Sequence, residues 1–296
     1  VGERNSGDIH VVKRRGGRRR VGSLKVFSQP GVGEGGLLGL ALHPDFPTNR
    51  LVYAYLSTRD DNRIVRMRYA GGEVGKREVI LAGIPRNVHH NGGGLAFGPG
   101  GLLFASTGDG EDGDRAQNPR SLGGKVLRLT PEGDVPADNP FGNFTWSLGH
   151  RNVEGIAFDA RGTLWASEFG EKEADELNRI EPGANYGWPR VEGGDGSGGY
   201  RDPLAEWSPT STCSPAGIAV ANGRAWLGAL RGECIFSVRL RGPDSGKIRR
   251  HFAGRFGRIR QVAKAPDGSL WITTSNRDGR GSPGPDDDKV IRVVLP

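Results

Sequence analysis

One short phrase recurs five times along the chain and restricts the folds that the chain can adopt. Each copy has a glycine or glutamine, an aliphatic residue and an alanine, then a turn with Pro, Asp, Asn or Gly, and then a second apolar segment. The copies begin at Gly39, Gly94, Gly155, Gly217 and Gln261. Two short apolar segments joined by a turn are typical of a β-hairpin, so the repeat predicts five antiparallel hairpins.

A further strand is expected after most of the hairpins. These predicted strands cover residues 125–129, 176–180, 234–240 and 290–294. Radial repetition of antiparallel sheets is the β-propeller arrangement, which leaves only short sheet edges. Segments 1–4 and 7–12 resemble the last two strands of another blade, whose first strand would lie upstream of Val1. We predict one all-β domain over residues 1–296, a six-bladed β-propeller of antiparallel sheets with its first blade incomplete at the N-terminus.

The composition agrees with a turn-rich β protein and excludes other classes. Glycine accounts for 50 of 296 residues, against roughly 7% in an average protein, and it follows no collagen-like period. No apolar run approaches the roughly 18 residues of a membrane helix, so a spanning segment is not expected. No long helical apolar stripe is present, which excludes a helical bundle.

The net charge of +7 raises the question of a nucleic-acid partner. The most basic run is Lys13-Arg14-Arg15-Gly16-Gly17-Arg18-Arg19-Arg20. Two central glycines predict a turn between two strands, and no aromatic residue interleaves the cations to stack on bases. We therefore interpret the run as a solvated turn and expect no nucleic-acid binding.

Two features bear on location. The chain begins at Val1 inside a strand-like segment, and we expect that a signal peptide and some mature sequence precede it, which indicates a periplasmic, secreted or cell-surface protein. Cys213 and Cys234 are too few for a cysteine framework or a four-cysteine metal site. One disulfide suits an exported protein, and two buried thiols fit equally well.

Two segments of the sequence contain residues that could carry chemistry. His90 precedes the glycine run 92–94 and could act as a general base, although satisfied loop histidines fit as well. A zinc site shared with His89 is disfavoured, because adjacent residues of a strand point to opposite faces. The segment 168–176 is rich in carboxylates that suit Ca²⁺, or it forms a solvated acidic loop.

Four arginines form the remaining signal. Arg151, Arg231, Arg258 and Arg260 come from three repeats, next to positions expected on innermost strands. In a propeller such positions converge on one end of the axial channel, where four cations predict a polyanionic ligand. Scattered surface arginines are the alternative.

Six motifs in order resemble a known family. They are Gly33-Glu34-Gly35-Gly36-Leu37-Leu38-Gly39, His43-Pro44-Asp45-Phe46, His90-Asn91-Gly92-Gly93, Gly149-His150-Arg151-Asn152, Asn185-Tyr186-Gly187-Trp188-Pro189 and Leu230-Arg231-Gly232. Together they resemble the soluble quinoprotein glucose dehydrogenases and aldose sugar dehydrogenases, which use pyrroloquinoline quinone (PQQ). The likeness runs from about Gly7 to the C-terminus. It implies a six-bladed propeller that oxidises aldose sugars at C1 and passes electrons to an external acceptor.

The resemblance also implies roles for individual residues. The base falls on His90, the carboxylate that orients it on Asp109, and a catalytic arginine near the reactive carbonyl on Arg151. The positions that bind the cofactor fall on Glu34, Arg151, Asn152, Thr212, Arg231, Arg258 and Arg260. A Ca²⁺ that polarises the quinone falls on the carbonyls of Gly170 and Glu171, and a second, structural Ca²⁺ falls near Asp175, Glu176 and Tyr186.

Departures from the glucose enzymes narrow the resemblance. His89 stands where they have an aspartate, Gly94 replaces an arginine, and the insertions that form their glucose pocket and dimer contacts look short or absent. This favours the aldose sugar dehydrogenase branch, with a broader choice of sugar and a monomeric protein. The alternatives are a calcium-dependent propeller hydrolase such as a lactonase, and a non-catalytic propeller that binds a protein.

Overall fold

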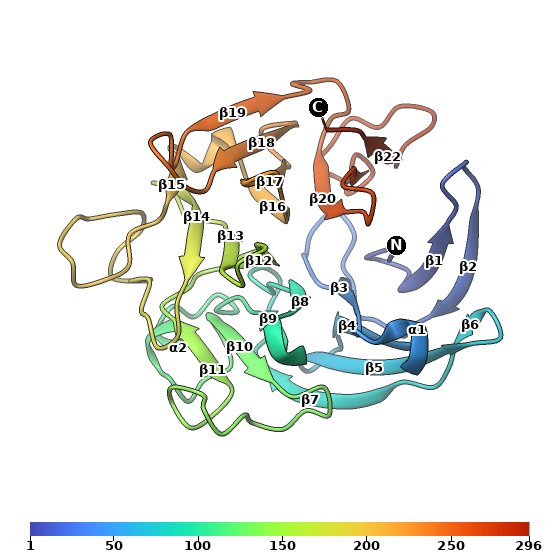
Figure 1. Cartoon of the computed structure of the whole chain (residues 1–296), viewed down its shortest axis with the longest axis horizontal. Coiled ribbons are helices and arrows are strands. Elements are labelled where there is room, and N and C mark those ends of the chain that lie inside the picture. Colours follow the sequence, from blue (N-terminus) through green and yellow to red (C-terminus); the bar gives the residue numbers. More distant parts are fainter. Residues whose placement is uncertain (296) are drawn as a thin grey trace.

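The computed structural model describes residues 1–295, and nearly all of its regular structure is β-sheet. Five antiparallel sheets of three to five strands and one sheet of two strands surround a central axis (Figure 1). The helical segments are short, and they include α1 (Phe46–Asn49) and α2 (Asp114–Gln117). None of the helices described has the length and apolar character needed to cross a bilayer. The predicted all-β propeller is confirmed.

The sheets follow one another in chain order. The two-stranded sheet contains β1 (Asp8–Val12) and β2 (Arg18–Ser23). The next contains β3 (Leu37–Leu42), β4 (Leu51–Ser57), β5 (Asn62–Ala70), β6 (Glu73–Val74) and β7 (Glu78–Ile84). The third contains β8 (Leu95–Phe97), β9 (Leu103–Ser106), β10 (Lys125–Leu129) and β11 (Thr145–Leu148).

The remaining three sheets complete the ring. One contains β12 (Val153–Phe158), β13 (Leu164–Glu168), β14 (Asp175–Ile180) and β15 (Ala205–Trp207). Another contains β16 (Pro215–Ala221), β17 (Arg224–Ala229), β18 (Cys234–Arg239) and β19 (Ile248–His251). The last contains β20 (Ile259–Lys264), β21 (Leu270–Thr274) and β22 (Val290–Val293). All five predicted hairpins are present. The four predicted further strands are also present, and their observed bounds differ from the predicted ones by at most one residue.

The repeated phrase forms the first strand of each multi-stranded sheet, and its glycine contacts the following sheet. A Cβ on Gly39 would lie 2.0 Å from the carbonyl oxygen of Gly93, in the segment that leads into β8. A Cβ on Gly94 would lie 3.1 Å from the amide nitrogen of Ile156 in β12. A Cβ on Gly155 would lie 2.7 Å from the carbonyl oxygen of Ala216 in β16. The repeat therefore requires glycine because successive first strands approach one another too closely for any side chain.

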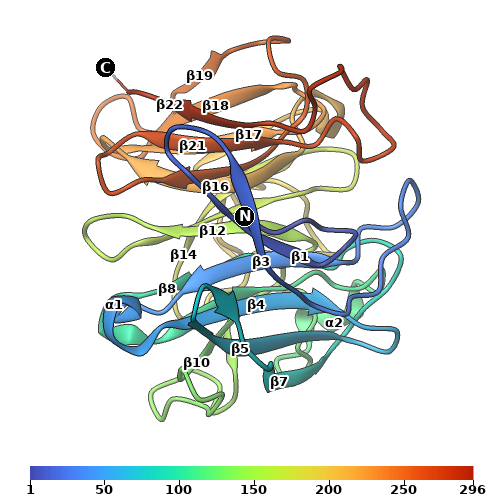
Figure 2. The same cartoon turned by 90° about the vertical axis from the view of Figure 1, so that its right-hand side faces the viewer.

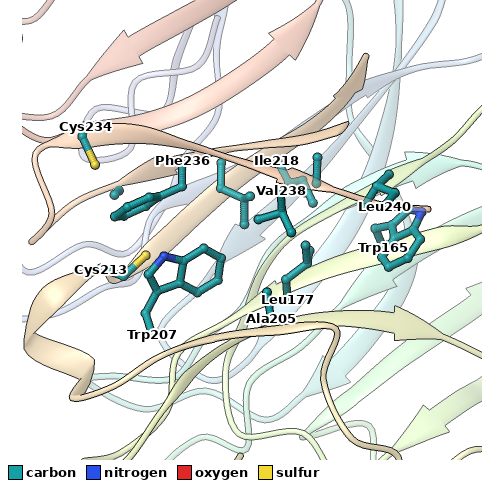
Figure 3. Packing of buried hydrophobic residues seen from close by; sticks show 13 residues of the cluster. Trp165, Leu177, Ala205, Trp207, Cys213, Ile218, Cys234, Phe236, Val238 and Leu240 are labelled. Carbon is teal, nitrogen blue, oxygen red and sulfur yellow. The ribbon is translucent and has the colours of Figure 1, made fainter. Parts of the chain in front are cut away.

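The hydrophobic core is divided into layers between neighbouring sheets. Figure 3 shows the layer in which Trp207 lies against Phe236 and Trp165 lies beside Leu240, with Ile218 and Val238 between them. Four similar clusters occupy other intervals between sheets. Cys213 and Cys234 lie in the cluster of Figure 3 as buried free thiols, and burial raises the pKa of each. The sequence analysis left open whether these residues form a disulfide or remain thiols, and in this structure they are two thiols.

The β1–β2 sheet lies between β20–β22 and the sheet that begins with β3 (Figures 1 and 2). Ile9 and Val21 pack against residues of β3 to β5, and Gly2 forms an isolated bridge with Ile9. The basic run forms the predicted turn, in which the amide of Gly16 donates to the carbonyl of Lys13. The structure thus gives five multi-stranded blades. The sequence analysis missed β5, β6 and β7 in the first of them and the outer strands β11, β15 and β19 in the next three.

Candidate functional site

The predicted base and its carboxylate form a hydrogen-bonded pair. Nδ1 of His90 lies 2.8 Å from Oδ1 of Asp109, and Asp109 is buried with 1% of its surface exposed. An ionised carboxylate only accepts hydrogen bonds, so we assign the imidazole proton to Nδ1. Nε2 is then left with the lone pair that a general base needs.

Two other donors hold the Asp109 carboxylate in place. The amide of Glu111 donates to Oδ1 at 2.8 Å, and the indole Nε1 of Trp188 donates to Oδ2 at 2.8 Å. Both oxygens of the buried carboxyl are therefore engaged, and Oδ1 is directed at Nδ1 of His90.

The backbone around His90 is tightly constrained. His90 has a left-handed φ of 56°, and its amide donates to the carboxylate of Glu34 at 2.9 Å. A Cβ on Gly108 would lie 2.0 Å from the carbonyl oxygen of His90, so glycine is required there. A non-glycine residue in this conformation is uncommon and is held by its surroundings, as is frequent at functional sites.

His89 corrects one step of the sequence analysis. His89 and His90 lie in the loop between β7 and β8 rather than in a strand, so the alternation of faces does not apply to them. The two imidazoles nevertheless have separate partners, because Nδ1 of His89 lies 2.8 Å from the carboxylate of Glu111. They bind different carboxylates, and no shared metal is needed to explain their placement.

Arg151 and Asn152 lie next to the His90–Asp109 pair. The carbonyl of Arg151 accepts the amide of Asp109 at 2.8 Å, and Oδ1 of Asn152 accepts the amide of Gly92 at 3.0 Å. The guanidinium of Arg151 lies 5.4 Å from the ring centroid of Trp188. Its Nε is buried without a hydrogen-bond partner among the residues described. An orphaned guanidinium nitrogen at this point fits an anionic ligand.

Arg258 and Arg260 converge, but each has a carboxylate partner. Nε and one terminal nitrogen of Arg258 lie 3.1 and 3.0 Å from Oδ2 of Asp278, and Arg260 lies 3.9 Å from the same oxygen. Arg260 also donates to Glu154 at 3.1 Å. The charge of these two predicted cations is therefore offset by Asp278 and Glu154, which the sequence analysis did not include.

Four charged residues near the axis were missed by the sequence analysis. They are Arg4, Glu154, Asp278 and Arg280. Arg280 lies 3.6 Å from Glu34, and the Arg4 guanidinium, whose pKa is lowered mainly by burial, faces Arg260, Asp278, Glu154 and Glu34. The one available signal was the long polar loop after β21, which contains Asp278 and Arg280.

Arg231 and Thr212 lie in two exposed segments that contact each other. Arg231 is in the exposed turn between β17 and β18, so its predicted place beside an innermost strand was wrong. Thr212 is exposed in the short helical turn Thr210–Thr212, and its hydroxyl donates to the carbonyl of Pro209. The two segments touch, because the amide of Gly232 donates to the carbonyl of Cys213 at 3.0 Å.

The acidic loop is organised by a carboxylate from outside it. Oε1 of Glu192 accepts the amides of four successive residues, which are Glu171, Lys172, Glu173 and Ala174. The carboxylate of Asp175 accepts the amides of Gly170 and Ser214, and burial raises its pKa to about 7. The loop is thus a folded turn, and its residues Glu171, Lys172 and Glu173 are exposed to solvent.

Glu176 and Tyr186 lie at the base of this loop. Burial, followed by the nearby charge of Glu168, raises the pKa of Glu176 to about 8. The Tyr186 ring stacks on His150 at 4.5 Å, and its hydroxyl donates to the carbonyl of Arg179. A cavity of about 10 Å³, room for about one atom the size of a water, is lined by Gly149, Arg151, Glu168, Phe169, Gly170, Glu176, Tyr186, Trp188, Val191 and Glu192.

Some of the oxygen donors around this cavity suit a hard cation. Glu168 and Glu176 supply buried carboxylates, and neither Asp175 nor Glu176 forms an ion pair with a basic side chain among residues 1–295. Oxygen donors without a compensating cation are the ligands that Ca²⁺ prefers. The Tyr186 hydroxyl is already engaged, so the side chains of Asp175, Glu176 and Tyr186 do not by themselves converge on one point.

Comparison with known proteins places the chain in a family. The family described as Glucose / Sorbosone dehydrogenase matches residues 1–283. The structure of the PQQ-bound aldose sugar dehydrogenase of Streptomyces coelicolor is similar at 44% identity and a TM-score of 0.93, covering 99% of this chain and 89% of that one. A putative oxidoreductase of Thermus thermophilus, described as a glucose dehydrogenase, has 41% identity and a TM-score of 0.90, covering 98% of this chain and 91% of that one.

A curated relative gives the same result at lower identity. The aldose sugar dehydrogenase YliI of Escherichia coli is 30% identical over 284 residues, which cover 83% of this chain and 76% of that protein. The family match over residues 1–283 includes the loops that bear His90, Asp109 and Arg151. By its sequence and its fold, this chain belongs to the glucose/sorbosone dehydrogenase family.

Proposed function

We propose that this protein oxidises aldose sugars at C1 to the lactone, with PQQ and Ca²⁺ as its cofactors and an external electron acceptor. The observation that carries the proposal is the His90–Asp109 pair beside Arg151, whose Nε has no partner among the residues described. A base and an anion-binding group at the end of the propeller axis are what proton removal and cofactor binding require.

The chain itself supplies the proton transfer. Nε2 of His90 takes the proton from the C1 hydroxyl as the C1 hydrogen leaves with its electron pair. The imidazolium that forms is stabilised by the buried Asp109 carboxylate at Nδ1. Two electrons and two protons leave the sugar, and the C1–O bond becomes the carbonyl of the lactone.

The site residues divide the remaining work between cofactor and metal. Cofactor binding is assigned to Glu34, Arg151, Asn152, Thr212, Arg231, Arg258 and Arg260. Metal binding is assigned to the carbonyls of Gly170 and Glu171, with a second Ca²⁺ near Asp175, Glu176 and Tyr186. When bound, PQQ supplies a quinone that accepts hydride, and Ca²⁺ polarises the accepting carbonyl as a Lewis acid.

The proposal extends to the organisation of the molecule. The β1–β2 sheet, next to β20–β22 in Figure 1, represents part of a sixth blade of a one-domain propeller. The protein acts as a monomer outside the cytoplasm. Its sugar specificity is broad, in keeping with the aldose sugar dehydrogenases.

The test is reconstitution. Protein supplied with PQQ and Ca²⁺ is expected to bleach an artificial electron acceptor only when an aldose is added. Chelator is expected to abolish the rate and to lower the melting temperature, and Ca²⁺ to restore both, because a ligand that binds only the folded state stabilises it. No bleaching at saturating PQQ and Ca²⁺ would overturn the proposal, and hydrolysis of a lactone under the same conditions would favour the hydrolase instead.

A further inference from the structure

We propose that Trp188 is a positioning residue for the base, which it orients through Asp109. This inference rests on the proposed function for its catalytic meaning. Trp188 lies in the connection between β14 and β15, and its indole N–H donates to Oδ2 of Asp109 at 2.8 Å. It belongs to the segment 185–189, one of the motifs that carry the resemblance. No role in the reaction has yet been given to Trp188 itself.

The two oxygens of Asp109 have separate tasks. Oδ1 holds Nδ1 of His90 and the amide of Glu111, each at 2.8 Å, whereas Oδ2 accepts the Trp188 indole. No other side-chain donor reaches Oδ2 among the residues described. Because rotation of a carboxyl about χ2 is soft, the indole bond at Oδ2 and the Glu111 amide at Oδ1 together keep Oδ1 directed at His90.

The indole bond also sets how strongly Asp109 attracts the proton of His90. Each donor to a carboxylate withdraws some of its negative charge and makes it a weaker acceptor for the others. Removing the Trp188 N–H leaves a buried carboxylate oxygen without a partner, so the charge concentrates on the bond to His90. The imidazolium is then stabilised, and His90 becomes a base that is protonated at higher pH.

The backbone of Trp188 is held by two hydrogen bonds, which a positioning role requires. The amide of Trp188 donates to the carbonyl of Gly149 at 3.0 Å, and its carbonyl accepts Nε2 of Gln117 at 2.6 Å. The ring lies 5.4 Å from the guanidinium of Arg151. Trp188 therefore contacts both the carboxylate that orients the base and the arginine with an unpartnered Nε.

Trp188→Phe tests the bond, and Trp146→Phe is a matched control. Phenylalanine keeps an aromatic ring and removes the N–H. Trp146 also packs against an arginine, with Arg128 at 4.4 Å from the ring centroid, but it lies on β11 and its indole N–H has no partner among the residues described. The control removes an indole N–H from a similar aromatic–arginine contact away from Asp109.

The first readout is the titration of His90 followed by NMR in the cofactor-free protein. Trp188→Phe is expected to move the midpoint of the His90 imidazole upward by roughly one pH unit, and Trp146→Phe to leave it in place. The other charged groups that face the pair are Glu34, Glu111, Arg115 and Arg151, and neither variant changes them. An unmoved midpoint in a folded Trp188→Phe protein would overturn the proposal.

A second readout needs no substitution at Trp188. In the wild-type protein the indole Nε1–H signal of Trp188 is expected to shift with the same midpoint as His90, while that of Trp146 stays constant. A Trp188 signal that does not respond to the His90 titration would also overturn the proposal. This measurement remains decisive if Trp188→Phe fails to fold.

Activity gives the third readout and separates the two proposals. In the reconstituted enzyme, Trp188→Phe is expected to lower kcat roughly tenfold with little change in KM, and to move the acid limb of the pH profile upward. If wild-type protein oxidises no sugar while the NMR shifts occur as expected, the proposed function fails and the Trp188 arrangement stands. If wild-type protein is active and Trp188→Phe leaves the pH profile unchanged, the positioning role fails alone.

Discussion

Arg260 donates a hydrogen bond to Glu154 at 3.1 Å, and this ion pair joins β20 to β12, the first strands of two different sheets. Burial raises the pKa of Glu154 to about 7, and the charge of Arg260 opposes the rise. An anionic ligand that binds Arg260 must therefore compete with Glu154. Binding of such a ligand therefore depends on whether the carboxyl of Glu154 is charged.

Arg260→Ala is expected to weaken PQQ binding about 10- to 100-fold, because one charge-assisted hydrogen bond to a carboxylate of the ligand is lost. Calorimetric titration of the cofactor-free protein measures this directly. Arg292→Ala is the control, since Arg292 lies in the same sheet but pairs with Asp267 on the surface. Equal affinity in Arg260→Ala and wild-type protein would remove Arg260 from the cofactor site.

PQQ affinity is expected to rise as the pH falls through the pKa of Glu154, which lies at about 7. Glu154 takes up a proton there, loses its charge and releases Arg260 to the ligand. Glu154→Gln imitates the protonated state, so this variant is expected to bind PQQ more tightly than wild-type protein on the alkaline side and to lose the pH dependence. Titrations of both proteins at several pH values test this, and a slope retained in Glu154→Gln would contradict it.

His90→Ala is expected to lower kcat by about 10²- to 10⁴-fold, the usual contribution of a general base. PQQ affinity is expected to change little, because His90 is not among the groups assigned to hold the cofactor. His89→Ala is the paired control, since His89 binds Glu111 and stands apart from Asp109. Steady-state kinetics distinguishes the two, and loss of turnover in His89→Ala alone would transfer the base to His89.

Lys125 gives a prediction about stability. It is fully buried, and its Nζ donates to the carbonyls of Arg115, Ala116 and Gly123. Burial lowers its pKa to about 7, so between pH 7 and about 10 the unfolded chain binds more protons than the folded one. This residue therefore makes the free energy of unfolding increase with pH in that window, by at most about 1.4 kcal/mol per pH unit.

Lys125→Met is expected to remove that slope and to destabilise the fold by about 3 kcal/mol, since the buried carbonyls that Nζ contacts lose their donor. Urea unfolding of both proteins at several pH values on the alkaline side of neutrality provides the comparison. An unchanged dependence on pH in Lys125→Met would mean that Lys125 is charged in the folded protein throughout this range.

Gly155→Ala is expected to destabilise the protein by about 1–3 kcal/mol, as overpacked positions do. The new Cβ would lie 2.7 Å from the carbonyl oxygen of Ala216, and the backbone of Gly155 has no left-handed φ that could add to the cost. Gly284→Ala is the control, because its Cβ would meet nothing closer than 3.6 Å. A loss of stability no greater than that of the control would show that the first strands can separate without cost.

The strands of the five repeated hairpins could be predicted from the sequence because each depends on local alternation and on turn residues. The pairs that build the site could not, because they join distant segments. Nothing near Trp188 in sequence indicates that its N–H reaches Asp109, and Glu154 looks like any polar residue of a strand until Arg260 lies beside it. His90 was placed in a strand because its left-handed φ leaves no mark on the local sequence.

The repeat glycines give the ring a direction. Each leaves room for the first strand of the following sheet, so an added side chain at Gly94 or Gly155 would meet the next blade as well as the second strand of its own sheet. The series ends at Gln261, whose side chain occupies the space beside Gly217 and which has a full side chain where the other repeats have none. A side chain added at Gly217 would therefore collide with Gln261, on the same strand that carries Arg260 into the site.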